Sequence, residues 1–212
     1  GYYARVAEGR MNGRVSRLLV TPLLLAMERV LGPSDYISFM KSFRYPLAGE
    51  FSFRRSLIPE LRIPSDWGLE VGILTEIYRN HSTKRVCQVE VADNYDHKHQ
   101  ELSADDSRRG LSRMSTDIST SLFRIMATFG LVFDQGTVRT VKASYLRIAL
   151  DLIESYSNDA TMNGLRFDRD AEERAIETFA TNVLKAGRSF LDSGEEMPYV
   201  PSWNRVLSVY PG

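Results

Sequence analysis

The side chains best suited to chemistry lie in one short segment near the middle of the chain, "VEVADNYDHKHQEL". It combines Asp93, Asp96, His97 and His99, and carboxylate and imidazole groups are ligands of divalent metal ions. A complete zinc site is a weak prediction, because there is no Cys pair and the one other histidine is His81. Mg²⁺ or Mn²⁺ would take carboxylates and one imidazole, and substrate phosphates would fill the open positions. The alternative is a solvated turn of charged residues, and the residues alone leave both interpretations open.

A second candidate is the segment "GRMNGRVSR", residues 9–17, which precedes a predicted helix. Backbone N–H groups at the start of a helix, together with arginine side chains, can bind an anion. An ordinary basic loop is the competing interpretation.

The third candidate is Glu70, within a predicted helix over Leu69–Tyr78. Glu70, Leu74 and Ile77 follow the spacing i, i+4, i+7 and therefore share one face of that helix. Because an isolated buried charge is costly, this carboxylate is either paired at the rim of the core or turned towards a polar ligand.

Helices and one strand must position these groups. Pro22 with Thr21 as its cap predicts a helix that ends at Gly32, and a second helix is expected from Ser34. Alternation of apolar and polar residues over Arg85–Val91 predicts a strand that ends beside the histidine cluster, with Cys87 packed on one face.

The second half of the chain is predicted to be helical. Apolar residues recur at helical spacing over 111–129, 138–156 and 175–184, with Gly- and Asn-containing loops between these stretches. The aromatic tail "MPYVPSWNRVLSVYPG" is expected to lie on the surface or to pack on a partner subunit.

Composition excludes several classes of protein. The 27 basic and 27 acidic residues give a net charge of zero, which argues against nucleic acid or an anionic membrane as a partner. A single cysteine favours a cytoplasmic setting, and "LLVTPLLLAM" is too short to span a bilayer. "GLSRMS" does not fit the G-x-S-x-G pattern of a hydrolase nucleophile, and no signal peptide is recognised at the start.

Five segments taken in order carry a family resemblance: "NGRVSRLLVTPLL", "PLAGEFSFRR", "WGLEVGILTEIY", "QVEVADNYDHKHQ" and "LSRMS". They resemble the acceptor half of the glucosyl-3-phosphoglycerate synthases, which are retaining glycosyltransferases of the GT-A type. The resemblance implies an α/β fold to which this chain contributes a predominantly helical part with a few strands. It also implies transfer of glucose from a UDP-sugar to 3-phosphoglycerate, assisted by Mg²⁺ or Mn²⁺.

The resemblance assigns roles to particular residues. His97 matches the family's metal-binding histidine, and catalysis would be positional and electrostatic, with Glu70 and Arg14 as the candidate catalytic residues. The substrate-binding residues that it implies are the phosphate loop Gly13, Arg14, Val15 and Ser16, the sugar-side Gly49, Glu50, Trp67, Gly68 and Glu70, and the acceptor-side His99 and Gln100.

The chain departs from the family in two ways. His99 stands where some relatives have an acceptor-side Asn, and no D-x-D motif or nucleotide-binding strand precedes Gly13. We therefore expect residues 1–105 to be the acceptor and metal-site half of a GT-A catalytic domain, and residues 106–212 a helical C-terminal region. The implied partners are the missing N-terminal half, a nucleotide-sugar donor, a phosphorylated acceptor and a second copy in a homodimer.

Two alternatives stay open. A related transferase could use GDP-mannose or another phosphorylated acceptor, because the donor-selecting residues would lie outside this chain. In the other, the chain is a non-catalytic helical interaction domain in which the "DHKHQ" segment is a solvated turn.

Overall fold

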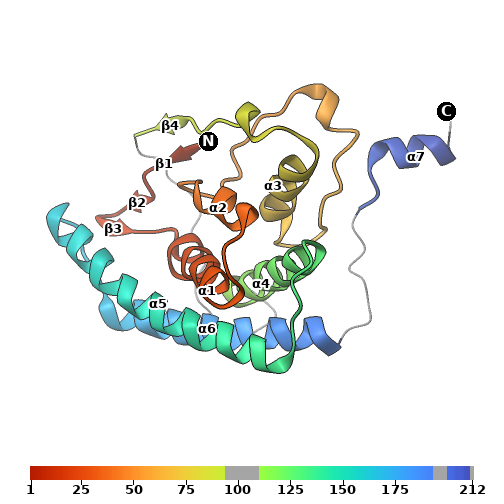
Figure 1. Ribbon diagram of the computed structural model, residues 1–212. Helices are drawn as coiled ribbons and strands as arrows, with labels where there is room; N and C mark the ends of the chain where they lie inside the picture. The colour runs from red at the N-terminus through yellow and green to blue at the C-terminus, as the bar shows by residue number, and fades with distance from the viewer. Residues whose placement is uncertain (94–109, 193–199, 211–212) are drawn as a thin grey trace.

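The computed structural model describes residues 1–93, 110–192 and 200–210 of the 212-residue chain. Its largest elements are two long helices, α5 (Gln135–Met162) and α6 (Arg169–Asp192), which lie side by side (Figure 1). Two further helices, α1 (Thr21–Leu31) and α4 (Gly110–Thr128), pack against this pair. The three amphipathic helices predicted for the second half of the chain are thereby confirmed.

The first helix begins earlier than predicted. A π-helical segment, Val15–Val20, continues into α1 without a break, because Val20 and Thr21 both have helical backbone angles. Thr21 is therefore inside a continuous helical stretch, and its prediction as a cap is wrong. Burial explains the extension, since Val15, Leu18 and Leu19 all face the core. The end at Gly32 is confirmed, with φ at +94°, a conformation that glycine adopts readily.

Two shorter helices follow as expected. Helix α2 (Asp35–Lys41) is capped by Ser34, whose hydroxyl accepts a hydrogen bond from the Ile37 N–H at 3.4 Å. Helix α3 (Leu69–Asn80) confirms the prediction over 69–78.

The strand expected over Arg85–Val91 is much shorter in the structure. Thr83–Arg85 forms a 3₁₀ turn, and strand β4 covers only Glu90–Ala92. It pairs in parallel with β1 (Tyr2–Tyr3), so the ladder is as short as its two-residue partner. Strands β2 (Val6–Ala7) and β3 (Arg10–Met11) form a separate antiparallel pair.

Between the 3₁₀ turn and β4, the extended segment is held by a side chain instead of a ladder. The Gln88 amide donates to the Ser42 carbonyl at 2.8 Å and accepts from the Arg44 N–H at 2.7 Å. Cys87 is exposed, so the prediction that it packs on a buried strand face is wrong.

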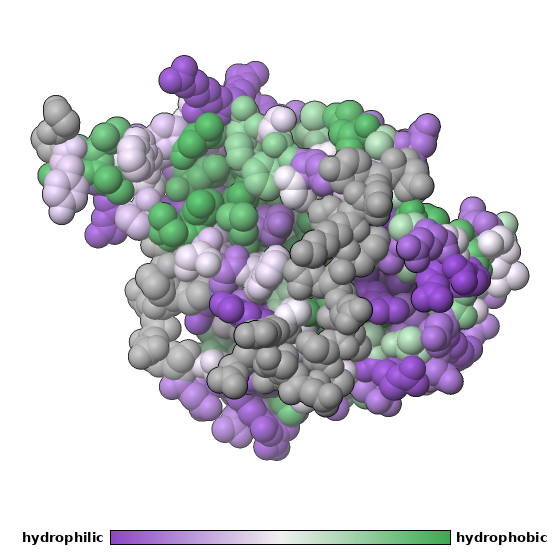
Figure 2. Space-filling model, turned by 180° about the vertical axis from the view of Figure 1, so that it is seen from behind, coloured by the Kyte–Doolittle hydropathy of each residue, from purple (hydrophilic) through white to green (hydrophobic). Residues whose placement is uncertain are grey.

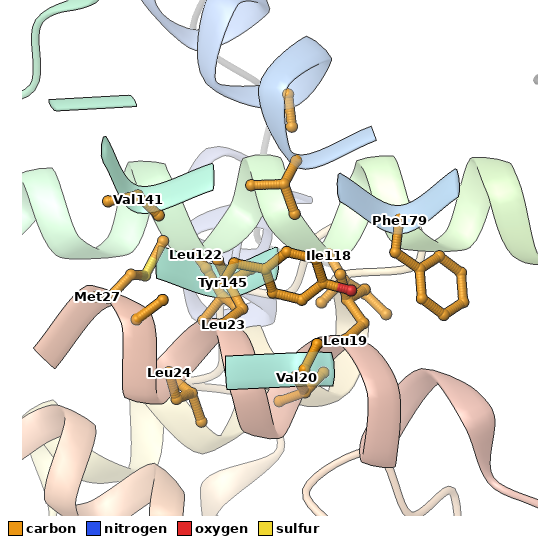
Figure 3. Close-up of a cluster of buried hydrophobic side chains, with 14 of the residues drawn as sticks. Leu19, Val20, Leu23, Leu24, Met27, Ile118, Leu122, Val141, Tyr145 and Phe179 are labelled. Carbon is orange, nitrogen blue, oxygen red and sulfur yellow. The ribbon is translucent and has the colours of Figure 1, made fainter. Parts of the chain in front are cut away.

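One hydrophobic core joins the helices. Figure 3 shows Tyr145 of α5 at its centre, surrounded by side chains of the first helix and of α4. The Tyr145 hydroxyl donates to the Leu18 carbonyl at 2.6 Å, which satisfies the one polar atom of a fully buried ring. Core residues come from both sides of residue 105, so residues 1–105 and 106–212 share this core.

A predominantly helical chain with a few strands is what the sequence predicted, and this part of the fold class is confirmed. The last helix, α7 (Trp203–Val209), stands apart from the core (Figure 1). It is attached through loop 59–63, where the Asn204 N–H donates to the Pro59 carbonyl at 3.0 Å and Val200 pairs with Ile63. Within the described ranges, no helix has the length and apolar character needed to cross a bilayer.

Candidate functional site

A cavity of about 130 Å³ collects several of the residues that the sequence singled out. Its walls come from the N-terminal strand, from the loop around Glu50, from helix α3 and from the segment 86–88. Two carboxylates, Glu50 and Glu70, line it together with the aromatic residues Tyr45, Phe51 and Phe53. Carboxylates beside aromatic rings are suited to binding the hydroxyl groups and apolar faces of a polar organic ligand.

Glu70 lies in the first turn of α3, and Leu74 and Ile77 line the same cavity. The predicted common face of these three residues is therefore confirmed. Burial raises the pKa of Glu70, while its own backbone N–H partly offsets this rise. An acceptor carboxylate with a raised pKa is costly without a ligand, which makes Glu70 a candidate to bind a hydroxyl group.

Glu50 also lines the cavity, from an irregular loop. Its carboxylate accepts a hydrogen bond from the Tyr3 hydroxyl at 3.2 Å and lies 3.6 Å from Arg5 Nη2. The N-terminal amine of Gly1 donates to the Glu50 carbonyl, and Gly49 is exposed beside it. Burial and the neighbouring Glu50 carboxylate raise the pKa of Tyr3 to about 12, although Arg5 acts against this shift. Tyr3 therefore remains a neutral hydrogen-bond donor to Glu50.

Arg5 links this cavity to the predicted phosphate loop. Its guanidinium lies 3.9 Å from the centre of the Tyr3 ring and 4.2 Å from that of Tyr45, so it is held between two aromatic side chains. The Arg5 carbonyl accepts a hydrogen bond from the Asn12 N–H at 2.7 Å. A side chain on Gly13 would meet Tyr45 at 3.2 Å, and Gly13 has φ at +73°. Tyr45 therefore lies between the loop and the cavity, and Arg5 packs against it.

The phosphate-loop residues are divided between surface and core. Arg14 is half-exposed, with 37% of its side-chain surface accessible, whereas Val15 and Ser16 are buried. The Ser16 hydroxyl has no hydrogen-bond partner within the described ranges. The helical segment begins immediately after Arg14, earlier than the sequence predicted, with the Arg17 N–H bonded to the Gly13 carbonyl at 3.0 Å.

Three predicted sugar-side residues, Gly49, Trp67 and Gly68, do not line the cavity. Trp67 is 39% exposed and lies two residues before the start of α3. Gly68 is buried against α4, where an added Cβ would lie 2.1 Å from the Ser121 hydroxyl oxygen. Gly68 thus has a packing role in allowing α3 and α4 to approach each other closely.

His97, His99 and Gln100 lie outside the described residues. Among residues 1–93, 110–192 and 200–210, no three His, Cys, Asp or Glu side chains come together as a metal site. The described carboxylates therefore do not make up a site for Mg²⁺ or Mn²⁺ by themselves.

A larger hollow of about 500 Å³ adjoins the first one and shares Phe43, Val86 and Gln88 with it. Its other lining residues are the aromatic Phe39 and Tyr78 and the polar Asp35, Ser42 and Thr83. It contains none of the predicted site residues, so the smaller cavity with its two carboxylates is the better candidate site.

Sequence reasoning missed Arg5, Tyr3 and Tyr45. The signal for Tyr45 was its position directly before the "PLAGE" segment, but nothing in the pattern "GYYAR" indicated that Arg5 would lie between two tyrosines. It also missed Glu172, on α6, which binds Arg14 from 158 positions away.

Two curated proteins are similar to this chain along its whole length. The glucosyl-3-phosphoglycerate synthase of Persephonella marina (strain DSM 14350 / EX-H1) is 44% identical over 211 residues, which cover 100% of this chain and 52% of that protein. The protein of the same name from Methanococcoides burtonii (strain DSM 6242 / NBRC 107633 / OCM 468 / ACE-M) is 40% identical over 214 residues, again 100% of the chain and 52% of that protein. The chain thus spans about half the length of the curated relatives it matches.

No family model and no solved structure matches the chain. The resemblance predicted from the five segments is nonetheless confirmed, because both curated relatives bear the name of that family and match all of the chain. The chain is similar over its full length to part of the glucosyl-3-phosphoglycerate synthases.

Proposed function

We propose that this chain forms the acceptor side of a glycosyltransferase that transfers glucose from a UDP-sugar to the hydroxyl of 3-phosphoglycerate. The main support is the match of the whole chain, at 44% and 40% identity, to two proteins named glucosyl-3-phosphoglycerate synthase. The cavity adds a physical argument, since Glu50 and Glu70 line it together with Tyr45, and Tyr45 packs against Gly13. Such a neighbourhood is suited to a sugar hydroxyl and an acceptor phosphate held close together.

In this proposal each described residue has a defined task. Arg14, with the backbone around Gly13, binds the acceptor phosphate and orients the hydroxyl that attacks the sugar. Glu70 accepts a hydrogen bond from a sugar hydroxyl, and Glu50, held by Tyr3 and Arg5, lines the same cavity. Within the described residues, no serine or cysteine forms a nucleophile–base pair with a histidine, and the reaction is proposed to proceed through positioning and electrostatic stabilisation.

The GT-A fold, retention of anomeric configuration and assistance by Mg²⁺ or Mn²⁺ are parts of the same proposal. His97 would contribute one metal ligand, and the bound ion would supply charge neutralisation for the departing diphosphate. The remaining ligands would come from carboxylates outside the described residues.

An assay of the complete protein tests the proposed function. Purified protein is incubated with UDP-glucose, GDP-glucose or GDP-mannose, and with 3-phosphoglycerate, 2-phosphoglycerate or glycerate, with Mg²⁺ or Mn²⁺ added. We expect a phosphorylated glucosylglycerate from UDP-glucose and 3-phosphoglycerate, identified by mass spectrometry. Preference for GDP-mannose or another acceptor would favour the related transferase, and absence of transfer from every donor would overturn the enzyme assignment.

A further inference from the structure

A buried carboxylate on α6 holds the predicted phosphate loop from behind. Glu172 has only 4% of its surface exposed, and its two oxygens bind two different arginines of the loop. Oε1 accepts from Arg14 Nε at 2.9 Å, and Oε2 accepts from Arg17 Nη2 at 2.8 Å. Charge-assisted hydrogen bonds of this length are strong, and they are strongest where water is excluded.

The two arginines differ in what else they bind. Arg17 also donates to the Asn12 carbonyl at 3.0 Å and to the Met11 carbonyl at 3.4 Å, and its guanidinium lies over the Tyr156 ring at 4.9 Å. Arg17 therefore stabilises the conformation of the loop. Arg14, by contrast, donates only through Nε. Its Nη1 and Nη2 donate to no residue in the described ranges.

This arrangement orients Arg14. A hydrogen bond to Nε fixes the plane of the guanidinium and leaves the two Nη groups, on a half-exposed side chain, as a paired donor edge. A phosphate takes two parallel N–H donors from such an edge. We propose that Glu172 is the positioning residue that presents Arg14 to the acceptor phosphate, an inference that rests on the proposed function.

Positioning and charge predict opposite effects of Glu172→Gln on phosphate binding. Glu172, Arg14 and Arg17 together carry a net charge of +1, and neutralising Glu172 would raise it to +2. If only the local field mattered, Glu172→Gln would strengthen phosphate binding. If positioning matters, the same change frees Arg14 to rotate and weakens phosphate binding.

The test uses the complete protein with Glu172→Gln, and with Glu173→Gln as its matched control. Glu173 is the next residue on α6, but it pairs at the surface with Arg169 at 2.8 Å and does not contact the loop. We expect Glu172→Gln to raise the KM for 3-phosphoglycerate by roughly tenfold. The KM for the sugar donor should change by less than about twofold, and Glu173→Gln should leave both values unchanged. A lower acceptor KM, or an equal rise for donor and acceptor, would overturn the proposal.

A double-mutant cycle separates positioning from general support of the fold. In an Arg14→Ala background, Glu172→Gln should have no further effect on the acceptor KM, because the group that it positions is gone. An effect of the same size in both backgrounds would contradict the inference. If Glu172→Gln fails to fold, Glu172→Asp takes its place in the same cycle, since it keeps the charge but shortens the reach by one methylene group.

Binding of inorganic phosphate, measured by calorimetry, distinguishes this inference from the proposed function. If the wild-type protein transfers no glucose but binds phosphate, and if Glu172→Gln weakens this binding only when Arg14 is present, then the positioning role holds and the reaction assignment fails. If transfer to 3-phosphoglycerate occurs but the variants bind phosphate as the wild type does, the reaction assignment holds and Glu172 has no positioning role. Absence of phosphate binding by the wild-type protein would also overturn the inference.

Discussion

Glu70 shows how one side chain can have opposite effects on stability and function. Burial raises its pKa, so the folded state favours the protonated carboxyl group more than the unfolded state does. For an acid whose folded-state pKa is raised, stability falls as the pH increases from its usual value near 4.5 through the raised value. At neutral pH the ionised carboxylate therefore lowers the stability of the folded protein. A hydrogen bond from a ligand hydroxyl would offset this loss.

Glu70→Gln is expected to make the protein more stable and less active. The amide cannot ionise, so Tm at pH 7 should rise by roughly 1–3 °C and the fall in stability above pH 4.5 should become smaller. Transfer should decrease by about tenfold or more, since an amide is a weaker acceptor of a sugar hydroxyl. Thermal unfolding from pH 4 to pH 8 and initial rates check both effects. Glu76→Gln, on the same helix but outside the cavity, is the control, and an unchanged pH dependence for Glu70→Gln would contradict this account.

His97 carries the proposed metal role. His97→Ala should lower Mg²⁺- or Mn²⁺-dependent transfer by roughly 10- to 100-fold, because one ligand of the ion is lost. A chelator should abolish the wild-type activity, and added metal should restore it. His81→Ala is the matched control, since His81 is a histidine at the end of α3 that lies 3.9 Å from Glu60. Full activity of His97→Ala with the wild-type metal dependence would contradict the assignment.

At the level of elements, close packing of the helices sets the position of the loop. Helix α6 provides both Glu172, for the phosphate loop, and a series of small and apolar residues that face α4 and α5. Gly187 contacts α5, and the buried polar residue Asn182 contacts α4. An added Cβ on Gly187 would lie 2.4 Å from Val138 of α5, and the Asn182 amide donates to the Ser115 hydroxyl of α4 at 2.8 Å. Any shift of α6 would therefore be transmitted to Arg14.

Gly187→Ala is expected to destabilise the protein by about 1–3 kcal/mol, because the new methyl group overlaps a branched side chain on a neighbouring helix. The helix propensity of alanine offsets part of this cost. Denaturant unfolding measures the change, and Ser189→Ala, at an exposed position of the same helix, should stay within about 0.5 kcal/mol of the wild type. An increase in stability for Gly187→Ala would show that α5 and α6 can separate at no cost.

For the whole molecule, the most exposed apolar element is helix α7. Figure 2 shows from behind that this end of the molecule projects from the body, with apolar side chains on it and on the adjoining surface. Trp203 and Leu207 are 59% and 46% exposed. We propose that a second copy of the chain covers this apolar surface, in line with the homodimer that the family resemblance implies.

The double variant Trp203→Ala, Leu207→Ala should shift the complete protein from dimer to monomer in sedimentation experiments, because it removes two large apolar groups from the proposed interface. Met162→Ala, at an 84% exposed apolar residue on α5, is the control and should leave the mass unchanged. A dimer that persists in the double variant at all concentrations would place the interface elsewhere.

The sequence by itself determined the helices and the family resemblance. Helical periodicity and capping depend on neighbours within a turn or two, so α2, α3 and the three long helices could be predicted from local patterns, as could the common face of Glu70, Leu74 and Ile77. Predictions from local patterns were wrong where pairing with a distant segment determines the secondary structure. The strand over 85–91 is short because β1 offers only two residues for pairing, and Cys87 is exposed as a result.

Only the tertiary structure decided which charged groups meet. Arg5 and Glu50 are far apart in the chain, and Arg14 and Glu172 are separated by 158 positions. No local spacing encodes such pairs, because they arise when helices bring their buried faces into one core. The residues proposed to bind a phosphate and a sugar could therefore be selected from the sequence, whereas the contact of Glu172 with Arg14 is formed only when α6 packs beside the loop.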